Sequence, residues 1–171
     1  MEKFNVIAVD PGCPLTMAFI HHDGRYFYFA EADMVALNLK GNKWENDPIL
    51  TANKIKLWIE WSLLPVKAVV EKVNPMPGEG LVSACKFVGS MHLVMGIFAA
   101  LEIPVKQVAP VKWKRDLGLK RARDSNLKEV SRQRAIQAFP SSSHIFSRKG
   151  DHNRAEAGLL GLWLLRHGDK S

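Results

Sequence analysis

Runs of apolar residues alternate with turn residues along the first thirty positions of the chain. Apolar stretches cover 4–9, 15–20 and 26–30, and the segments Asp-Pro-Gly and His-Asp-Gly separate them. Short apolar runs between such turn residues predict three strands, and the Asp-Gly pair at 23–24 favours a tight hairpin. The polar stretch that follows, around Gly41 and Asn42, has no periodicity.

Helices and short strands alternate over the rest of the chain. Apolar residues recur near helical spacing from Pro48 to Leu63, behind an Asp47 that suits a helix start. Short apolar runs over 66–73 and 103–108 predict buried strands. Four further helices are expected, over 81–101, 109–117, 126–139 and 151–166. This order predicts a mixed α/β sheet covered by helices.

Composition places the chain among ordinary globular proteins. With 171 residues, 47% of them hydrophobic and 24% charged, it matches one domain over 1–171 whose core needs no disulfide. These values exclude a collagen-like fibre and a long disordered tail. The two distant cysteines, Cys13 and Cys85, with no basic-then-apolar leader and no apolar run approaching 18 residues, favour reduced thiols in a cytosolic protein.

Positive charge is concentrated in the second half of the chain. The net charge is +7, and the segment 106–154 carries thirteen Lys and Arg against four Asp and Glu. A basic segment of this length is typical of a surface that binds a polyanion. A solvated helix face explains the charge equally well.

Four acidic residues stand where the predicted elements end or begin. Asp10 and Glu71 close apolar strands, and Asp151 and Glu156 lie in the first turns of the last predicted helix. If the first and fourth strands are parallel neighbours, Asp10 and Glu71 emerge at the same end of the sheet. Carboxylates gathered in this way repel one another unless a cation lies between them, and oxygen ligands suit Mg²⁺ or Mn²⁺ rather than zinc.

Each acidic residue also has a purely structural explanation. Asp10 can serve as a turn residue, Asp151 as a helix cap, and Glu156 as a partner of the helix dipole. Glu71 is harder to dismiss, because a charge that closes a buried strand needs a partner. His152 could position a water or a leaving group, although a histidine at a helix start is usually idle. Together with the basic segment, the acids favour a phosphodiester substrate.

Three motifs surround the candidate acids: Val-Ile-Ala-Val-Asp-Pro-Gly at 6–12, Val-Val-Glu-Lys-Val at 69–73 and Lys-Gly-Asp-His-Asn-Arg-Ala-Glu-Ala at 149–157. Together they resemble the motifs of the RuvC-type Holliday junction resolvases, within the ribonuclease H-like superfamily. The likeness is closest to compact phage and prophage members. It implies a ribonuclease H-like mixed sheet of about five strands, and a homodimeric, Mg²⁺-dependent endonuclease that cuts two opposed strands of a four-way DNA junction.

The resemblance also implies a role for individual residues. Asp10, Glu71 and Glu156 match the family's acids, which hold two metal ions: one activates water and the other stabilises the leaving 3′ oxygen. The family's fourth position falls on Asn153, a departure that leaves the fourth ligand open among Asn153, His152 and Asp151. We favour Asp151, because a carboxylate holds Mg²⁺ better than imidazole does.

The resemblance further implies how DNA and a second subunit are bound. The helix over 81–101 corresponds to the family's dimer helix, and Met76 lies in the loop where family members insert an apolar side chain near the crossover. A loop methionine packed against its own helix is an equal alternative. The basic residues expected to contact phosphates are Lys112, Lys114, Arg115, Lys120, Arg121, Arg123, Arg148 and Lys149.

Other functions share part of this pattern. A non-catalytic branched-DNA-binding protein would need the basic segment alone, and a less selective flap or fork nuclease would share the acids. An actin-like phosphotransferase would share Asp10-Pro11-Gly12, but the chain has no second Gly-rich phosphate-binding turn. We expect a protein of the cytoplasm, of a bacterium or a phage-infected cell, that acts on DNA and not at a membrane.

Overall fold

The computed structural model describes residues 3–12, 14–22, 27–30, 36–39, 43–75, 78, 80–119 and 127–168. In chain order the elements are β1 (Asn5–Asp10), β2 (Thr16–Ile20), β3 (Phe27–Ala30), β4 (Ala36–Leu39), β5 (Lys43–Asn46), α1 (Pro48–Trp61), β6 (Val66–Glu71), α2 (Leu81–Ala100), β7 (Val105–Val108), α3 (Pro110–Asp116), α4 (Leu127–Ala138), the 3₁₀ segment η2 (Pro140–Phe146) and α5 (His152–His167). Every strand and helix that the sequence predicted is present.

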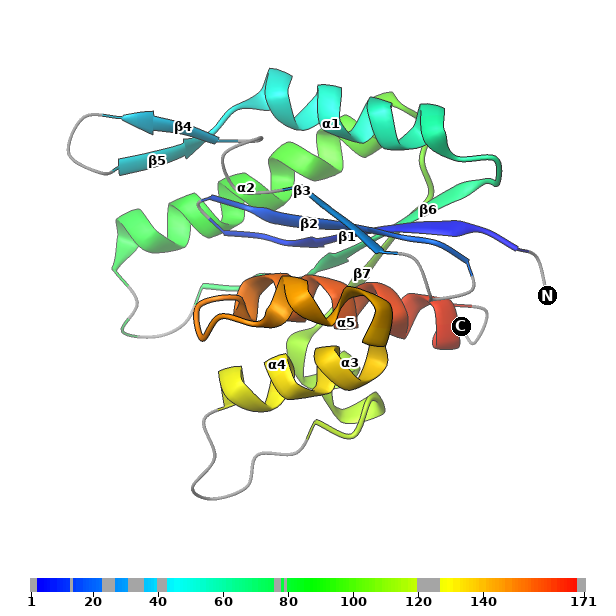
Figure 1. Cartoon of the computed structure of the whole chain (residues 1–171). Helices are drawn as coiled ribbons and strands as arrows, with labels where there is room; N and C mark the ends of the chain where they lie inside the picture. Colours follow the sequence, from blue (N-terminus) through cyan, green and yellow to red (C-terminus); the bar gives the residue numbers. More distant parts are fainter. Residues whose placement is uncertain are drawn as a thin grey trace.

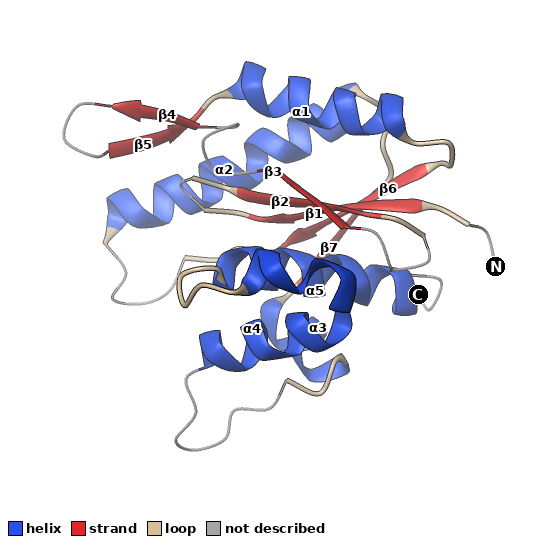
Figure 2. Cartoon of the chain, viewed as in Figure 1, coloured by secondary structure: helices blue, strands red, loops and turns tan. Residues whose placement is uncertain are grey.

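Five strands form one sheet in the order β3-β2-β1-β6-β7 (Figure 1). Strand β1 pairs antiparallel with β2 and parallel with β6, and β7 runs parallel to β6. Helices α1 and α2 cover one face of this sheet, and α3, α4 and α5 lie on the other (Figure 2). The predicted mixed sheet of about five strands is therefore confirmed.

Alternating side chains of β1 build the two halves of the core. Val6 and Ala8 are buried in the cluster that contains α5, whereas Ile7 and Val9 are buried in the cluster that contains α1 and α2. This is the period of two expected for a strand covered on both faces. Gly161 lets α5 approach the sheet closely, because a Cβ there would overlap with Ile20. Helix α5 is thereby fixed directly over β1 and β2.

Two parts of the prediction need correction. The segment around Gly41 and Asn42 has no periodicity, yet β4 and β5 on either side of it pair as an antiparallel ribbon. In addition, α2 is long and apolar enough, by length and composition alone, to cross a membrane, with Lys86 as its one charged residue. That indication is weak, because core helices of soluble proteins pass the same test.

Several residues singled out from the sequence lie outside the described part of the chain. They are Cys13, Met76, Lys120, Arg121 and Arg123. Cys85 is described, and it is an exposed free thiol on α2.

Candidate active site

Asp10 and Glu71 end two neighbouring parallel strands. Asp10 is the last residue of β1 and Glu71 is the last residue of β6, and the register sets Val9 opposite Val70 immediately before them. The two carboxyl groups therefore emerge at the same end of the sheet, as expected if these strands are parallel neighbours. This edge is where parallel sheets place their ligand sites.

The turn that follows Asp10 is held by two polar side chains from other elements. The Asn46 amide nitrogen donates to the Gly12 carbonyl oxygen at 2.7 Å and to Ser90 Oγ at 2.6 Å, and its Oδ1 accepts from the Leu15 amide at 2.9 Å. Ser90 Oγ, on α2, lies 2.7 Å from the same Gly12 oxygen. This network anchors the backbone next to Asp10, and neither Asn46 nor Ser90 was singled out from the sequence.

Glu156 reaches the same region from α5 and is paired with a lysine. Lys114 Nζ, on α3, lies 2.9 Å from Glu156 Oε2, and Ser131 Oγ, on α4, donates to Glu156 Oε1 at 3.1 Å. The Lys114 side chain is 25% exposed, so this is a partly buried ion pair rather than a surface one. Lys114 was predicted to contact DNA phosphates, and the structure places it against an acid of the site.

Glu71 is held by a buried tryptophan. Trp113 is fully buried on α3, and its Nε1 donates to Glu71 Oε2 at 2.7 Å. A buried indole N–H needs an acceptor, and a carboxylate is a strong one. Trp113 thus fixes the orientation of Glu71, a role that the sequence did not indicate.

Electrostatics tie the three acids to one another. Burial raises the pKa of Asp10 well above its ordinary value, and the charges of Glu71 and Glu156 raise it further, whereas Lys114 lowers it. The pKa of Glu71 is also raised by burial, against the lowering effects of Trp113 and Lys114. Asp10, Glu71 and Glu156 therefore form one cluster, which we call the acidic cluster, with Lys114 as its cation.

The acidic cluster suits a divalent cation by its chemistry. It presents hard oxygen donors that repel one another, which is the donor set of Mg²⁺ and Mn²⁺. Within the residues that the structure describes, no three Asp, Glu, His or Cys side chains converge closely enough to hold an ion. Glu156 is turned to Lys114, and Glu71 to Trp113.

Asp151 is buried beside α5 but is engaged elsewhere. Its Oδ2 accepts from the Arg148 amide at 2.8 Å, and its Oδ1 lies 3.3 Å from the Arg148 guanidinium and 3.7 Å from that of Arg154. The acids that act on Asp10 are Glu71 and Glu156, and the structure does not bring Asp151 to them. Asp151 as a metal ligand stays a prediction, which these ion pairs disfavour.

The two other candidates for the fourth ligand lie next to Asp151. Asn153 is exposed and lies one helical turn before Glu156. His152 is half-buried at the first position of α5, and within the described residues no polar contact of its ring is found. Neither residue is shown to touch the acidic cluster.

Four of the predicted DNA contacts are exposed. Lys112 and Arg115 are on α3, where both pair with Asp116, at 3.3 and 3.5 Å. Arg148 and Lys149 lie on the loop that precedes α5, the helix that carries Glu156. Their exposure is what contacts to a DNA backbone require.

Comparison with known proteins adds two findings. No protein-family model matches the chain. The chloroplastic Holliday junction resolvase MOC1 of Chlamydomonas reinhardtii is 31% identical over 96 residues, which is 56% of this chain and 10% of that protein. The chain thus matches about a tenth of the length of this relative.

Solved structures of the same fold cover almost the whole chain. Thermus thermophilus RuvC in complex with a Holliday junction substrate has a TM-score of 0.63 and 12% identity, over 96% of this chain and 95% of that chain. A second Thermus thermophilus RuvC structure has a TM-score of 0.54 and 14% identity, over 96% and 97%. The yeast mitochondrial Holliday junction resolvase Ydc2 has a TM-score of 0.56 and 9% identity, over 96% and 80%. The resemblance predicted from the motifs is confirmed at the level of the fold: the chain has the ribonuclease H-like fold of the RuvC-type Holliday junction resolvases.

Proposed function

We propose that the chain is a divalent-metal-dependent endodeoxyribonuclease that resolves four-way DNA junctions by paired, symmetrical nicks. The observation that carries this proposal is the acidic cluster, which lies at the carboxyl ends of β1 and β6 in a fold shared with RuvC and Ydc2. The sequence match to the resolvase MOC1 supports the same activity.

A catalytic role explains why the acids are kept together. Burial and nearby negative charge raise the pKa values of Asp10 and Glu71, so holding these acids together costs stability, and a functional site explains that cost. A non-catalytic branched-DNA-binding protein has no use for such a cluster. The acidic cluster therefore favours the nuclease over that alternative.

The residues of the cluster have separable tasks in the proposed reaction. A cation held by Asp10, Glu71 and Glu156, two ions in the arrangement that the resemblance implies, would polarise the scissile phosphate and lower the pKa of a bound water. Trp113 keeps Glu71 oriented toward the site through its Nε1 hydrogen bond. Lys114 balances the charge of Glu156 when the site is free of metal. The exposed basic residues hold the DNA backbones.

A cleavage assay tests the activity. A four-way junction, a fork and a plain duplex are incubated with the protein in Mg²⁺ or in chelator, and the nicks are mapped. We expect symmetrical nicks in the junction only, in Mg²⁺ only, and none with Asp10→Asn or Glu71→Gln, whereas Glu60→Gln on the exposed face of α1 cuts like the wild type. Equal cutting of all three substrates supports the less selective flap or fork nuclease. Cutting by Asp10→Asn at the wild-type rate contradicts the site.

We propose that α2 is the contact surface of a homodimer. Leu81 and Val82 are 79% and 71% exposed, although the opposite face of α2 packs on the sheet. Sedimentation should show a dimer for the wild type and a monomer for Val82→Asp. Ile49→Asp, at an equally exposed apolar position on α1, is the matched control and should stay dimeric. A monomeric wild type, or one that partitions into detergent as a membrane protein does, contradicts the proposal.

We place the protein in the cytoplasm, bound to branched DNA, and we retain a phage or prophage origin from the resemblance. The exposed free thiol of Cys85 is compatible with a reducing compartment.

A further inference from the structure

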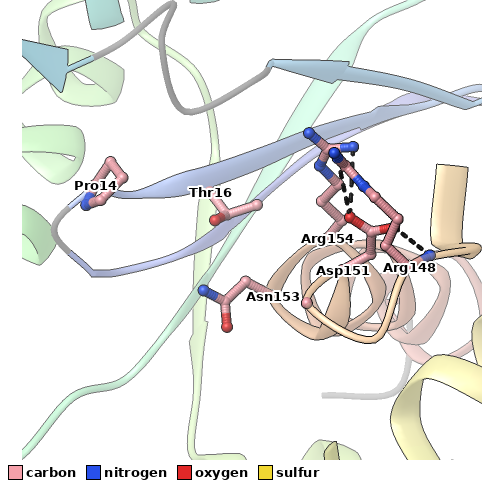
Figure 3. A pocket seen from close by; sticks show the side chains of 7 residues that line it. Pro14, Thr16, Arg148, Asp151, Asn153 and Arg154 are labelled. Atoms are coloured by element: carbon pink, nitrogen blue, oxygen red, sulfur yellow. Dashed lines mark hydrogen bonds and ion pairs between the residues drawn. The ribbon is translucent and has the colours of Figure 1, made fainter. Parts of the chain in front are cut away.

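A pocket of about 400 Å³ is built around Asp151. Figure 3 shows the side chains that line it. Its lining comes from the start of β2 with the turn before it, from the segment that leads into α5, and from the first turn of α5. The lining residues are Pro14, Thr16, Arg148, Gly150, Asp151, Asn153 and Arg154. We call it the arginine pocket. It contains two guanidinium groups and one carboxylate, so its lining carries a net positive charge.

The two guanidinium groups converge on one buried carboxylate. The Asp151 side chain is only 6% exposed, and its Oδ1 lies 3.3 Å from the Arg148 guanidinium and 3.7 Å from that of Arg154. Figure 3 shows both guanidinium groups beside this carboxylate. Because its Oδ2 also accepts from the Arg148 amide, the Asp151 carboxylate is fixed to the backbone of the loop. Long basic side chains lose rotamer freedom when they bind a ligand. Because Arg148 and Arg154 are already held by a fixed acceptor, they lose less of it. The Arg148 side chain is 72% exposed and therefore faces solvent and any DNA that approaches.

The arginine pocket is adjacent to the acidic cluster on two elements. Thr16 pairs with Asp10 in the ladder between β1 and β2. Asn153 precedes Glu156 by one turn of α5. A phosphodiester that entered the arginine pocket would therefore lie close to one positioned at the acidic cluster. One guanidinium can donate two parallel hydrogen bonds to a phosphate, and the arginine pocket contains two guanidinium groups.

We propose that the arginine pocket binds a backbone phosphate of the DNA strand that is cut, next to the scissile phosphate. Asp151 is then a positioning residue for Arg148 and Arg154, and not a ligand of the metal. This inference rests on the proposed function for the identity of the strand, but phosphate binding by the pocket is measured without cleavage.

Binding measurements on neutralised phosphates test the pocket directly. Four-way junctions that carry a single uncharged methylphosphonate, moved stepwise along the strand, are titrated with the protein in chelator. We expect one position at which neutralisation weakens binding by roughly tenfold in the wild type, as for one lost charge-assisted contact. The same substitution should have almost no effect on Arg154→Ala or Arg148→Ala, because the contact is already lost. Arg134→Ala, an exposed arginine on α4, is the matched control and should behave like the wild type.

The outcomes separate this inference from the proposed function. Equal effects of every methylphosphonate in the wild type and in both arginine variants overturn the phosphate site, even if the protein cuts junctions. If one methylphosphonate weakens binding of the wild type but not of the arginine variants, and the protein does not cut junctions in Mg²⁺, the phosphate site is supported and only the proposed activity is overturned. If an alanine variant fails to fold, Arg154→Lys replaces it. Lysine keeps the charge but lacks the paired N–H donors of the guanidinium, so the methylphosphonate effect should still be smaller than in the wild type.

A metal titration tests the role of Asp151. If Asp151 positions the arginines, Asp151→Asn weakens junction binding and lowers the cleavage rate, but the Mg²⁺ concentration for half-maximal cleavage stays at the wild-type value. Loss of binding should not grow further when Asp151→Asn is combined with Arg154→Ala. A raised Mg²⁺ midpoint with unchanged junction binding would instead identify Asp151 as a metal ligand and overturn its positioning role.

Discussion

Ionised Asp10 should destabilise the folded protein when no divalent cation is present. The pKa of Asp10 is raised by burial and by the charges of Glu71 and Glu156. The folded state therefore holds this proton more tightly than the unfolded chain, in which the pKa of an aspartate is about 3.9. The protein should lose stability as the pH rises from about 4 through the raised pKa, and the full loss should persist above it.

Replacing Asp10 by asparagine removes this titration and should stabilise the metal-free protein at neutral pH. Each pH unit by which the pKa of a carboxyl group is raised corresponds to about 1.4 kcal/mol. In the acidic cluster Asp10 faces two acids and one lysine, and removing one such charge is expected to add roughly 1–3 kcal/mol to the free energy of unfolding. For a chain of this size, each kcal/mol raises the melting temperature by about 2–4 °C.

Thermal unfolding in chelator at pH 4, 6 and 8 measures the effect. Asp10→Asn should melt above the wild type at pH 8, and the difference should shrink toward pH 4. Mg²⁺ should raise the melting temperature of the wild type and not that of the variant, because only a folded site with its full charge binds the ion. Glu60→Gln serves as the control for loss of an exposed carboxylate. A variant that is less stable than the wild type at pH 8, or a difference that does not depend on pH, refutes the reasoning.

Three further changes test individual contacts. Trp113→Phe removes the N–H group that donates to Glu71, so it should cost roughly 1–3 kcal/mol of stability and raise the pKa of Glu71. The acidic limb of the cleavage pH profile should then move to higher pH, and an unmoved limb counts against the contact. Lys114→Met removes a charge that lowers the pKa of the neighbouring acids, and it should shift the same limb in the same direction, whereas an unchanged profile would show that the lysine does not act on them. Gly161→Ala forces a Cβ against Ile20 and should lower stability by roughly 1–3 kcal/mol in chemical denaturation; an unchanged midpoint would mean that α5 does not lie so close to the sheet.

The sequence marked Asp10 and Glu71 as residues that meet if their strands are parallel neighbours. The structure pairs β1 and β6 in parallel, so this condition holds and both residues end neighbouring strands at one edge of the sheet. Trp113 and Lys114 were not assigned to the site, because each meets its acid across 42 positions of sequence. Which side of a short helix faces the sheet is decided by packing and not by the helix itself.

Helix periodicity separates Asp151 from Glu156. Five positions separate Asp151 from Glu156, which is about 1.4 turns of a helix, so they do not share a face. Asn153 is three positions from Glu156 and does share that face. The structure agrees with the helix period, since Asp151 turns to Arg148 and Arg154.

Strand breakage in a plasmid that extrudes a cruciform tests most directly whether the acidic cluster is the centre of a junction nuclease. Two coordinated nicks across the junction convert the supercoiled plasmid to linear DNA, and independent nicks leave an open circle. We predict linear product with the wild-type protein in Mg²⁺, and unchanged supercoiled DNA with Asp10→Asn or in chelator. Linear product from Asp10→Asn at the wild-type rate, or no breakage by the wild-type protein with Mg²⁺ or Mn²⁺, would contradict the central claim.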